Sequence, residues 1–149
     1  MHSFSFRMQR LLGFRNIQEE EARRELGQRN MALERETARL SGLEKEEESV
    51  IDRWRSQLQE SIELPRLQAT QDYNTLLENR LAQQAGQQMR SRRLVEEQRE
   101  IARKCWQQKK ILEILQNKAF DEYRRREQVR ERNLIDEIVL NTFNRKGGE

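Results

Sequence analysis

The sequence predicts an all-α protein in which two long helices fold back on each other as an antiparallel coiled-coil hairpin. Helix breakers are scarce, with six glycines and one proline among 149 residues. Charged residues make up 37% of the chain against 34% hydrophobic ones, and the interleaving of both signs is typical of a solvated helical surface. Apolar residues recur at steps of three, four or seven, which places them on one helical face. We expect one domain spanning residues 1–149.

The first helix is predicted over about residues 4–62. Leu26, Leu33 and Leu40 are seven residues apart, and the stripe continues through Leu43, Val50, Trp54 and Leu58. The only proline, Pro65, then marks the turn, which we expect at about 63–69. Proline lacks an amide donor and disfavours helix in the residue before it.

The second helix is predicted over about residues 70–143, followed by a flexible tail at 144–149. Its stripe begins at Tyr73, Leu77 and Leu81 and extends to Tyr123. Neither stripe is a strict heptad, because charged residues interrupt both: Arg29, Glu36, Glu47 and Lys109. A stripe this narrow needs a partner helix, and a turn near Pro65 supplies one.

Both ends of the chain are apolar. The start reads FSFRMQRLL, and the second helix closes with LIDEIVLNTF over residues 134–143. Because the second helix is the longer one, we expect it to return past the start of the first, so that the two segments lie together. Exposed apolar surface there would make a docking tip, and closure of the two ends on each other is the alternative. Arginines interrupt the apolar start, so we expect no secretory signal.

The sequence offers nothing that suggests catalysis. It has one histidine, His2, and no phosphate-binding glycine pattern, zinc-ligand spacing or nucleophile motif. Two packed helices also provide no enclosed pocket, so we predict no enzyme activity, cofactor, metal or small-molecule ligand. The single cysteine, Cys105, lies on the apolar stripe and is interpreted as a small hydrophobic residue. No apolar run approaches the roughly 20 residues that cross a bilayer.

The most basic stretch covers residues 86–110. It holds eight basic and three acidic residues, a net charge of +5. Such a stretch can bind phosphate backbones or an acidic partner surface. The glutamates and the lone Trp106 favour an acidic protein partner, or plain solvation, over nucleic acid. Binding of the basic, apolar chain start to a membrane surface is a further alternative.

Several motifs together resemble a known family. The start FSFRMQRLLGFRN resembles the F-x-F-x-x-Q-x-L-L start of many members of the FliJ family, the soluble component of the flagellar type III export apparatus. WRSQL at residues 54–58 resembles an aromatic-R-S-x-L stretch late in the first helix of some members. ARKCWQQKK resembles their W-x-x-K-K segment, and RNLIDEIVLNTF is similar to their phenylalanine-ended tail. The motifs span nearly the whole chain in the family's order.

The resemblance implies a non-enzymatic, stalk-like coiled coil of the flagellar export machine. Its terminal end would enter the hexameric ring of the export ATPase FliI and promote ring assembly and activity. Another part would contact the cytoplasmic domain of the export gate protein FlhA, and the ATPase regulator FliH and export chaperones are further implied partners. The implied location is cytoplasmic, at the periphery of the inner-membrane flagellar basal body. The equivalent stalk protein of a virulence-type secretion system, the injectisome, is the nearest alternative.

The resemblance also implies two sets of site residues. The ring-docking set comprises Phe4, Phe6, Arg7, Arg10, Leu11, Leu134, Ile138 and Phe143. The gate-binding set comprises Val50, Trp54, Leu77 and Leu81. The same matching reaches Leu43, Gln88, Glu47 and Gln84, of which the last two depart from the family pattern. For Trp54, packing against the second helix near Leu77 remains the alternative role.

Overall fold

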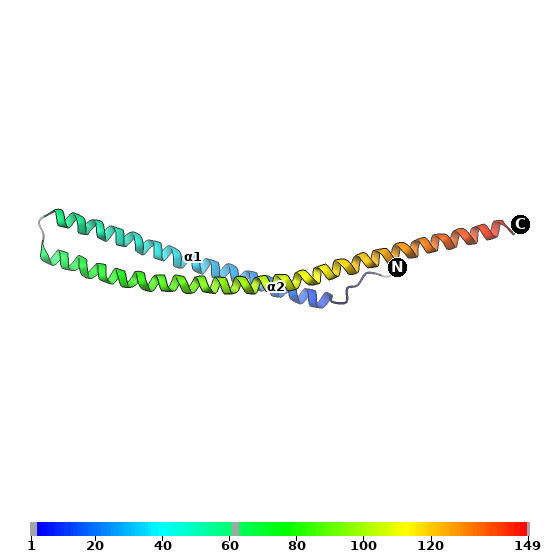
Figure 1. Cartoon of the computed structure of the whole chain (residues 1–149), viewed down its shortest axis with the longest axis horizontal. Coiled ribbons are helices and arrows are strands. Elements are labelled where there is room, and N and C mark those ends of the chain that lie inside the picture. Colours follow the sequence, from blue (N-terminus) through cyan, green and yellow to red (C-terminus); the bar gives the residue numbers. More distant parts are fainter. Residues whose placement is uncertain (1–2, 61–62, 149) are drawn as a thin grey trace. The chain divides into compact units, whose positions relative to one another are not determined.

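The computed structural model describes residues 3–60 and 63–148 and folds them into two long helices. Helix α1 covers Gln9–Gln59, 51 residues, and helix α2 covers Leu64–Lys146, 83 residues (Figure 1). The described ranges contain no strand. The predicted all-α class, with two long helices packed against each other, is confirmed.

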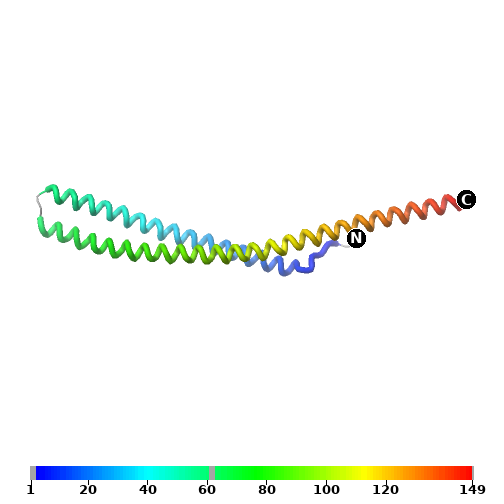
Figure 2. Tube along the Cα trace, viewed as in Figure 1, coloured from blue at the N-terminus to red at the C-terminus, as the bar shows by residue number. Residues whose placement is uncertain are grey.

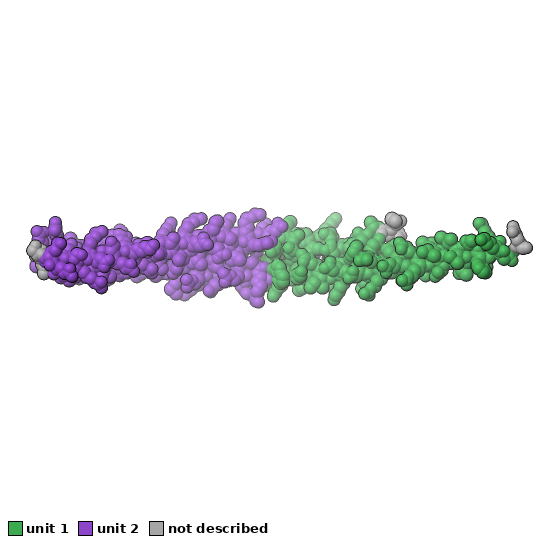
Figure 3. Space-filling model, turned by 90° about the horizontal axis from the view of Figure 1, so that it is seen from above, with its two compact units in different colours: residues 1–19, 104–149 green, residues 20–103 purple. Residues whose placement is uncertain are grey.

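The helices pair within two compact units, shown in different colours in Figure 3. Unit 2 is formed by Glu20–Arg103, and unit 1 by Met1–Glu19 together with Lys104–Glu149. In unit 2 the Thr70 hydroxyl donates to Gln57, and the Gln98 side-chain amide donates to the carbonyl of Ala22. These partners are 13 and 76 residues apart, and such growth in separation with distance from the turn is the mark of antiparallel pairing.

Unit 1 shows the same antiparallel pairing by itself. Arg15 donates to Gln108, 93 residues away, and Gln116 donates to Gln9, 107 residues away. The single domain stays a prediction, because each of the two compact units consists of parts of the same two helices.

The helix boundaries differ from those expected. Helix α2 begins at Leu64 rather than near residue 70, so Pro65 lies in its first turn. Proline is accepted there because the first amides of a helix have no intrahelical acceptor, and its fixed φ suits the helix. The amides of Arg66 and Leu67 instead donate to the Glu63 carbonyl, at 3.1 and 3.2 Å. The predicted helix end at Ile62 lies outside the described residues.

At the outer ends, α1 begins at Gln9 instead of near Phe4, and α2 continues to Lys146 beyond Phe143. The amide of Gln9 donates to the carbonyl of Phe6 at 3.1 Å, which closes the turn that leads into α1.

The core is a thin seam between the two helices. Among the described residues, six apolar side chains are buried along it: Leu12, Ala22 and Val50 from α1, and Leu77, Val95 and Leu112 from α2. Leu77 has no exposed surface at all. Burying a side chain of this size stabilises the folded state by about 1.5–3 kcal/mol.

Polar residues that interrupt the apolar stripes have partners across the seam. In unit 2, the Arg29 guanidinium donates to the carbonyl of Leu94 at 3.1 Å, and the Gln84 amide donates to the carbonyl of Glu36 at 3.0 Å. In unit 1, Lys109 Nζ lies 3.7 Å from a carboxylate oxygen of the buried Glu19. A buried polar group destabilises a fold only when it lacks a partner, so these pairs explain how an irregular heptad still packs.

The C-terminal part of α2 has no helix beside it. All residues from 131 to 148 are exposed, and Figure 2 shows the trace continuing alone within unit 1. The expectation that residues 134–143 lie beside the chain start is therefore wrong. Because α2 is 83 residues long against 51 for α1, antiparallel pairing brings the chain start only to the region of Phe120.

Candidate functional site

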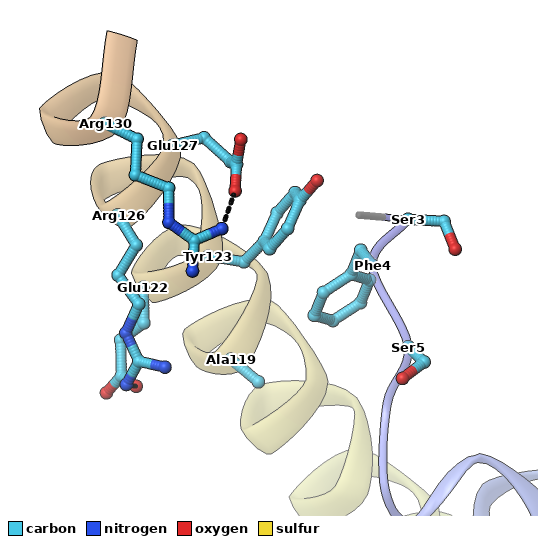
Figure 4. A pocket seen from close by; sticks show the side chains of 9 residues that line it. All are labelled: Ser3, Phe4, Ser5, Ala119, Glu122, Tyr123, Arg126, Glu127 and Arg130. Atoms are coloured by element: carbon cyan, nitrogen blue, oxygen red, sulfur yellow. Dashed lines mark hydrogen bonds and ion pairs between the residues drawn. The ribbon is translucent and has the colours of Figure 1, made fainter. Parts of the chain in front are cut away.

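The N-terminal segment before α1 is fixed to α2 by aromatic contacts. The ring of Phe4 meets Phe120 edge-on, with centroids 5.2 Å apart and an angle of 76° between the planes. It also lies beside the ring of Tyr123 (Figure 4), with the two ring centroids 5.6 Å apart. Such pairs contribute about 0.5–1.5 kcal/mol beyond their buried area, so Phe4 anchors the chain start to α2.

A shallow hollow of about 390 Å³ lies next to this anchor in unit 1. Charged residues form much of its wall, and they pair along α2: Arg130 with Glu127 at 2.8 Å and Arg126 with Glu122 at 3.8 Å. The full lining is Ser3, Phe4, Ser5, Ala119, Glu122, Tyr123, Arg126, Glu127 and Arg130 (Figure 4). The acidic and basic groups pair with each other here, so the residues that line the hollow include no poised nucleophile or base.

The predicted ring-docking residues fall into two groups that the structure does not bring together. Near the chain start, Phe4 and Phe6 are half-buried, whereas Arg7, Arg10 and Leu11 are exposed. On the C-terminal part of α2, Leu134, Ile138 and Phe143 are exposed by 57, 63 and 78%. The aromatic neighbours of Phe4 come from earlier in α2.

The sequence reasoning missed Phe120 as the partner of the chain start. The signal that could have found it is the pairing register, because residues equally far from the turn face each other in an antiparallel hairpin. The sequence predicts the turn several residues later than the structure has it, and it predicts the apolar residues 134–143 as the partner. The structure instead pairs the chain start with Phe120 and Tyr123.

The predicted gate-binding residues divide by burial. Val50, with 3% of its surface exposed, and Leu77, with none, belong to the seam, whereas Trp54 and Leu81 are half-buried. Trp54 lines a depression of about 300 Å³ together with Val50, Ile51, Arg55, Gln71 and Asn74. The indole therefore lies beside α2 at residues 71 and 74, and it keeps part of its surface open.

One polar atom in the wall of this depression is not satisfied. The Asn74 side-chain amide donates to Glu78 at 3.2 Å. Its carbonyl oxygen Oδ1 is buried and has no hydrogen-bond donor among the described residues. An orphaned buried acceptor of this kind costs about 1–3 kcal/mol.

A second polar contact in unit 2 joins the Tyr73 hydroxyl to a carboxylate oxygen of Glu46, to which it donates. This hydrogen bond to Glu46 is the main reason that the pKa of Tyr73 lies above its ordinary value of 10.0. Partial burial and the negative charge of Glu46 raise the pKa further, while Arg80 and Arg53 oppose them.

The remaining chemistry of the described residues is sparse. No helix among them is long and apolar enough to cross a membrane. Within residues 3–60 and 63–148, no group of three or more histidine, cysteine or acidic side chains is arranged to hold a metal ion. Cys105 is a free, half-buried thiol on the seam side of α2.

Comparison with known proteins identifies the chain. No curated protein and no solved structure matches it significantly. The model of one family, described as Flagellar FliJ protein, matches residues 4–148 and so covers the Phe4 anchor, both helices and the exposed end of α2. Members of this family are components of flagellar protein export and are not known as enzymes. The chain belongs to the FliJ family of flagellar export proteins.

Proposed function

We propose that this protein is a stalk that docks in the ring of the export ATPase FliI, promotes ring assembly and activity, and links the ring to the gate protein FlhA. Handling of export chaperones, contact with FliH and a cytoplasmic position at the periphery of the basal body belong to the same proposal. Membership of the flagellar family favours this system over the injectisome.

The observation that carries the proposal is the unpartnered end of α2. It exposes large apolar side chains over nearly three helical turns: Leu134, Ile135, Ile138, Val139, Leu140 and Phe143. Apolar surface concentrated in this way is characteristic of an interaction site, and an apolar helix docks readily inside a ring or groove. Insertion into the collar of an ATPase ring would cover all sides of such a helix.

The chain start supports docking in a second way. Phe4 holds the segment against α2, while Arg7 and Arg10 are exposed and free to meet acidic groups on the ATPase. Exposed cations around an apolar helix speed association with an acidic partner, and they make the rate depend on ionic strength.

Stimulation of the export ATPase tests this proposal. We expect deletion of residues 131–149 to abolish stimulation of FliI hexamer formation and ATP hydrolysis, because it removes the exposed end of α2. Residues 131–148 are wholly exposed, so this deletion leaves the helix pairing in place. Deletion of residues 1–15 should also abolish stimulation. That deletion is less specific, because it also removes the Phe4 ring from Phe120.

The matched control removes only residues 144–149, which retains the apolar side chains and should retain stimulation. Helicity per residue, measured by circular dichroism, verifies that both truncated proteins are folded. Full stimulation by the protein that lacks residues 131–149 would refute docking through this end.

For the gate, the proposal places the contact at the open face of Trp54 and at Leu81, with Val50 and Leu77 acting beneath them as seam residues. The burial of those two residues supports this division of roles. The depression beside Trp54 offers a partly apolar recess with Arg55 at its edge, which suits an apolar side chain of FlhA flanked by an acidic one.

A further inference from the structure

Unit 1 carries a second stripe on α2, apolar at its centre and polar at its ends, beside the one that forms the seam. We call it the side stripe; its positions follow each other at steps of four and three: Lys104, Gln108, Ile111, Leu115 and Lys118. This spacing keeps them on one face of the helix, next to the seam position Leu112. Ile111 is exposed by 59% and Leu115 by 39%. Two large aliphatic side chains therefore stand together at heptad spacing without a helix to cover them.

Helix α1 contributes to the same side of the pair. Arg15 Nη1 donates to Gln108 Oε1 at 2.8 Å, so Arg15 lies on the side of the side stripe. Leu11 lies one helical turn before Arg15 in α1. Because the two helices are antiparallel, one turn back along α1 corresponds to one turn forward along α2, from Gln108 towards Ile111. Leu11, exposed by 41%, thus lies on the side and near the level of Ile111 and Leu115.

Three cations flank these apolar residues, and none of the three is balanced by an ion pair. Arg15, Lys104 and Lys118 form no ion pair with any of the described acidic residues. Other cations of the unit are paired: Lys109 lies 3.7 Å from Glu19, and Lys110 lies 3.6 Å from Glu113. Unpaired cations at both ends of an apolar stripe are complementary to an anionic partner.

We propose that the side stripe, together with Leu11 and Arg15, binds an amphipathic helix of a partner protein, which packs as a third helix on unit 1. The partner helix would present apolar residues at heptad spacing to Leu11, Ile111 and Leu115. Acidic residues beside its apolar stripe would pair with the three unbalanced cations. This inference goes beyond the proposed function, because Ile111 and Leu115 belong to neither the ring-docking nor the gate-binding set.

The narrowness of the surface favours a helix over an anionic membrane. A helix seam is formed by a stripe one or two residues wide, whereas a membrane-bound helix needs a broad apolar face. Here Glu122, one turn beyond Lys118, continues the side stripe with a negative charge that would oppose anionic lipid.

The test uses the full chain and a synthetic three-heptad peptide with leucine at the a and d positions and glutamate at the e and g positions. Fluorescence anisotropy of the labelled peptide measures the dissociation constant. We expect saturable binding that weakens about tenfold with Ile111→Ala, because the lost contact is an apolar one at the centre of the stripe. Lys104→Glu combined with Lys118→Glu should weaken it further and restore binding to a peptide with lysine at e and g.

Trp106→Ala provides the control. Trp106 is another exposed apolar residue of the same helix, with 51% of its surface open, but it precedes Ile111 by five residues and so lies on a different face, and its replacement should leave the affinity unchanged. Equal binding of the glutamate and lysine peptides, or equal losses with Ile111→Ala and Trp106→Ala, would overturn the proposal. So would binding to phosphatidylserine vesicles that depends on Ile111 while the glutamate peptide does not bind.

Discussion

At the scale of single residues, stability depends on a few side chains that close the seam. Each buried apolar residue has one neighbouring helix to pack against, so its loss is not shared among many neighbours. Leu77 is the extreme case, since none of its surface is exposed, whereas its neighbour Leu76 is exposed by 46%. The two positions therefore separate the effect of packing from that of helix propensity.

We expect Leu77→Ala to lower the free energy of unfolding by about 2–3 kcal/mol, through lost burial and the cavity left behind. Leu76→Ala should change it by less than about 0.5 kcal/mol, because the side chain is largely solvated already. Urea denaturation followed by circular dichroism measures both. Equal losses in the two variants would mean that Leu77 does not hold the seam.

Tyr73 provides a pH-dependent contact of the same seam. The neutral phenol donates to Glu46, so the folded state raises the pKa of Tyr73 above 10.0. The stabilisation is fully present below the unfolded pKa and is lost as the pH rises through the higher folded value. Tyr73 and Tyr123 are the only two tyrosines of the sequence, so a Tyr123→Phe background isolates the phenolate absorbance of Tyr73.

In that background we expect the absorbance titration of Tyr73 to have its midpoint above that of free tyrosine. Glu46→Gln should bring the midpoint back down, because the main cause of the shift is removed. A midpoint unaffected by Glu46→Gln would show that burial, and not the hydrogen bond, controls this phenol.

At the scale of the helices, the sequence predicts the two elements well and their ends poorly. Spacing and the lack of breakers determine that α1 and α2 exist. Their boundaries depend on capping: the sequence predicts Pro65 within the turn at about 63–69, yet it fits the first turn of α2 because the Glu63 carbonyl accepts the next two amides. When the turn is predicted several residues late, every predicted pairing between a residue of α1 and a residue of α2 is shifted as well.

The unpaired end of α2 should also behave as a distinct element. Residues 131–146 have helical hydrogen bonds but no tertiary contact to protect them, so local opening costs little there. We expect their amides to exchange with deuterium at least about 100-fold faster than those around Leu112, as measured by exchange and mass spectrometry. Addition of the FliI ring should slow exchange in residues 131–146. Protection of this segment in the free protein would contradict the absence of a partner.

At the scale of the whole molecule, the two candidate surfaces lie in different units and can be disabled separately. We expect Trp54→Ala to weaken binding to the cytoplasmic domain of FlhA about tenfold, since a partly open tryptophan beside a recess is a typical energetic anchor. Isothermal titration calorimetry measures the affinity. Stimulation of the ATPase, which we assign to unit 1, should be unchanged.

Trp106→Ala is the control for this experiment. Trp106 is the other tryptophan, exposed by 51% and located in unit 1, so its loss should leave FlhA binding intact. If the Trp54→Ala variant and the unaltered protein bind FlhA with equal affinity, Trp54 serves only to pack against α2.

The site residues were only partly predictable, for a physical reason. Motif resemblance selects candidate residues but does not distinguish a side chain that would touch a partner from one that supports the surface beneath. Val50 and Leu77 were assigned to the gate surface, yet they are buried in the seam, whereas Trp54 from the same set is partly open. Helical periodicity does not resolve such cases, because the seam and its edges differ by one residue step.

The thin seam also affects how this sequence can change over generations. Most described positions face solvent, where one polar residue replaces another at almost no cost in stability. Three of the polar seam contacts have a backbone acceptor, as when Gln98 donates to the carbonyl of Ala22, and any residue at position 22 supplies that carbonyl. Selection on folding therefore acts on a spaced handful of positions and on the avoidance of breakers. We expect members of such a family to drift far apart in residue identity while the spacing of their apolar residues persists.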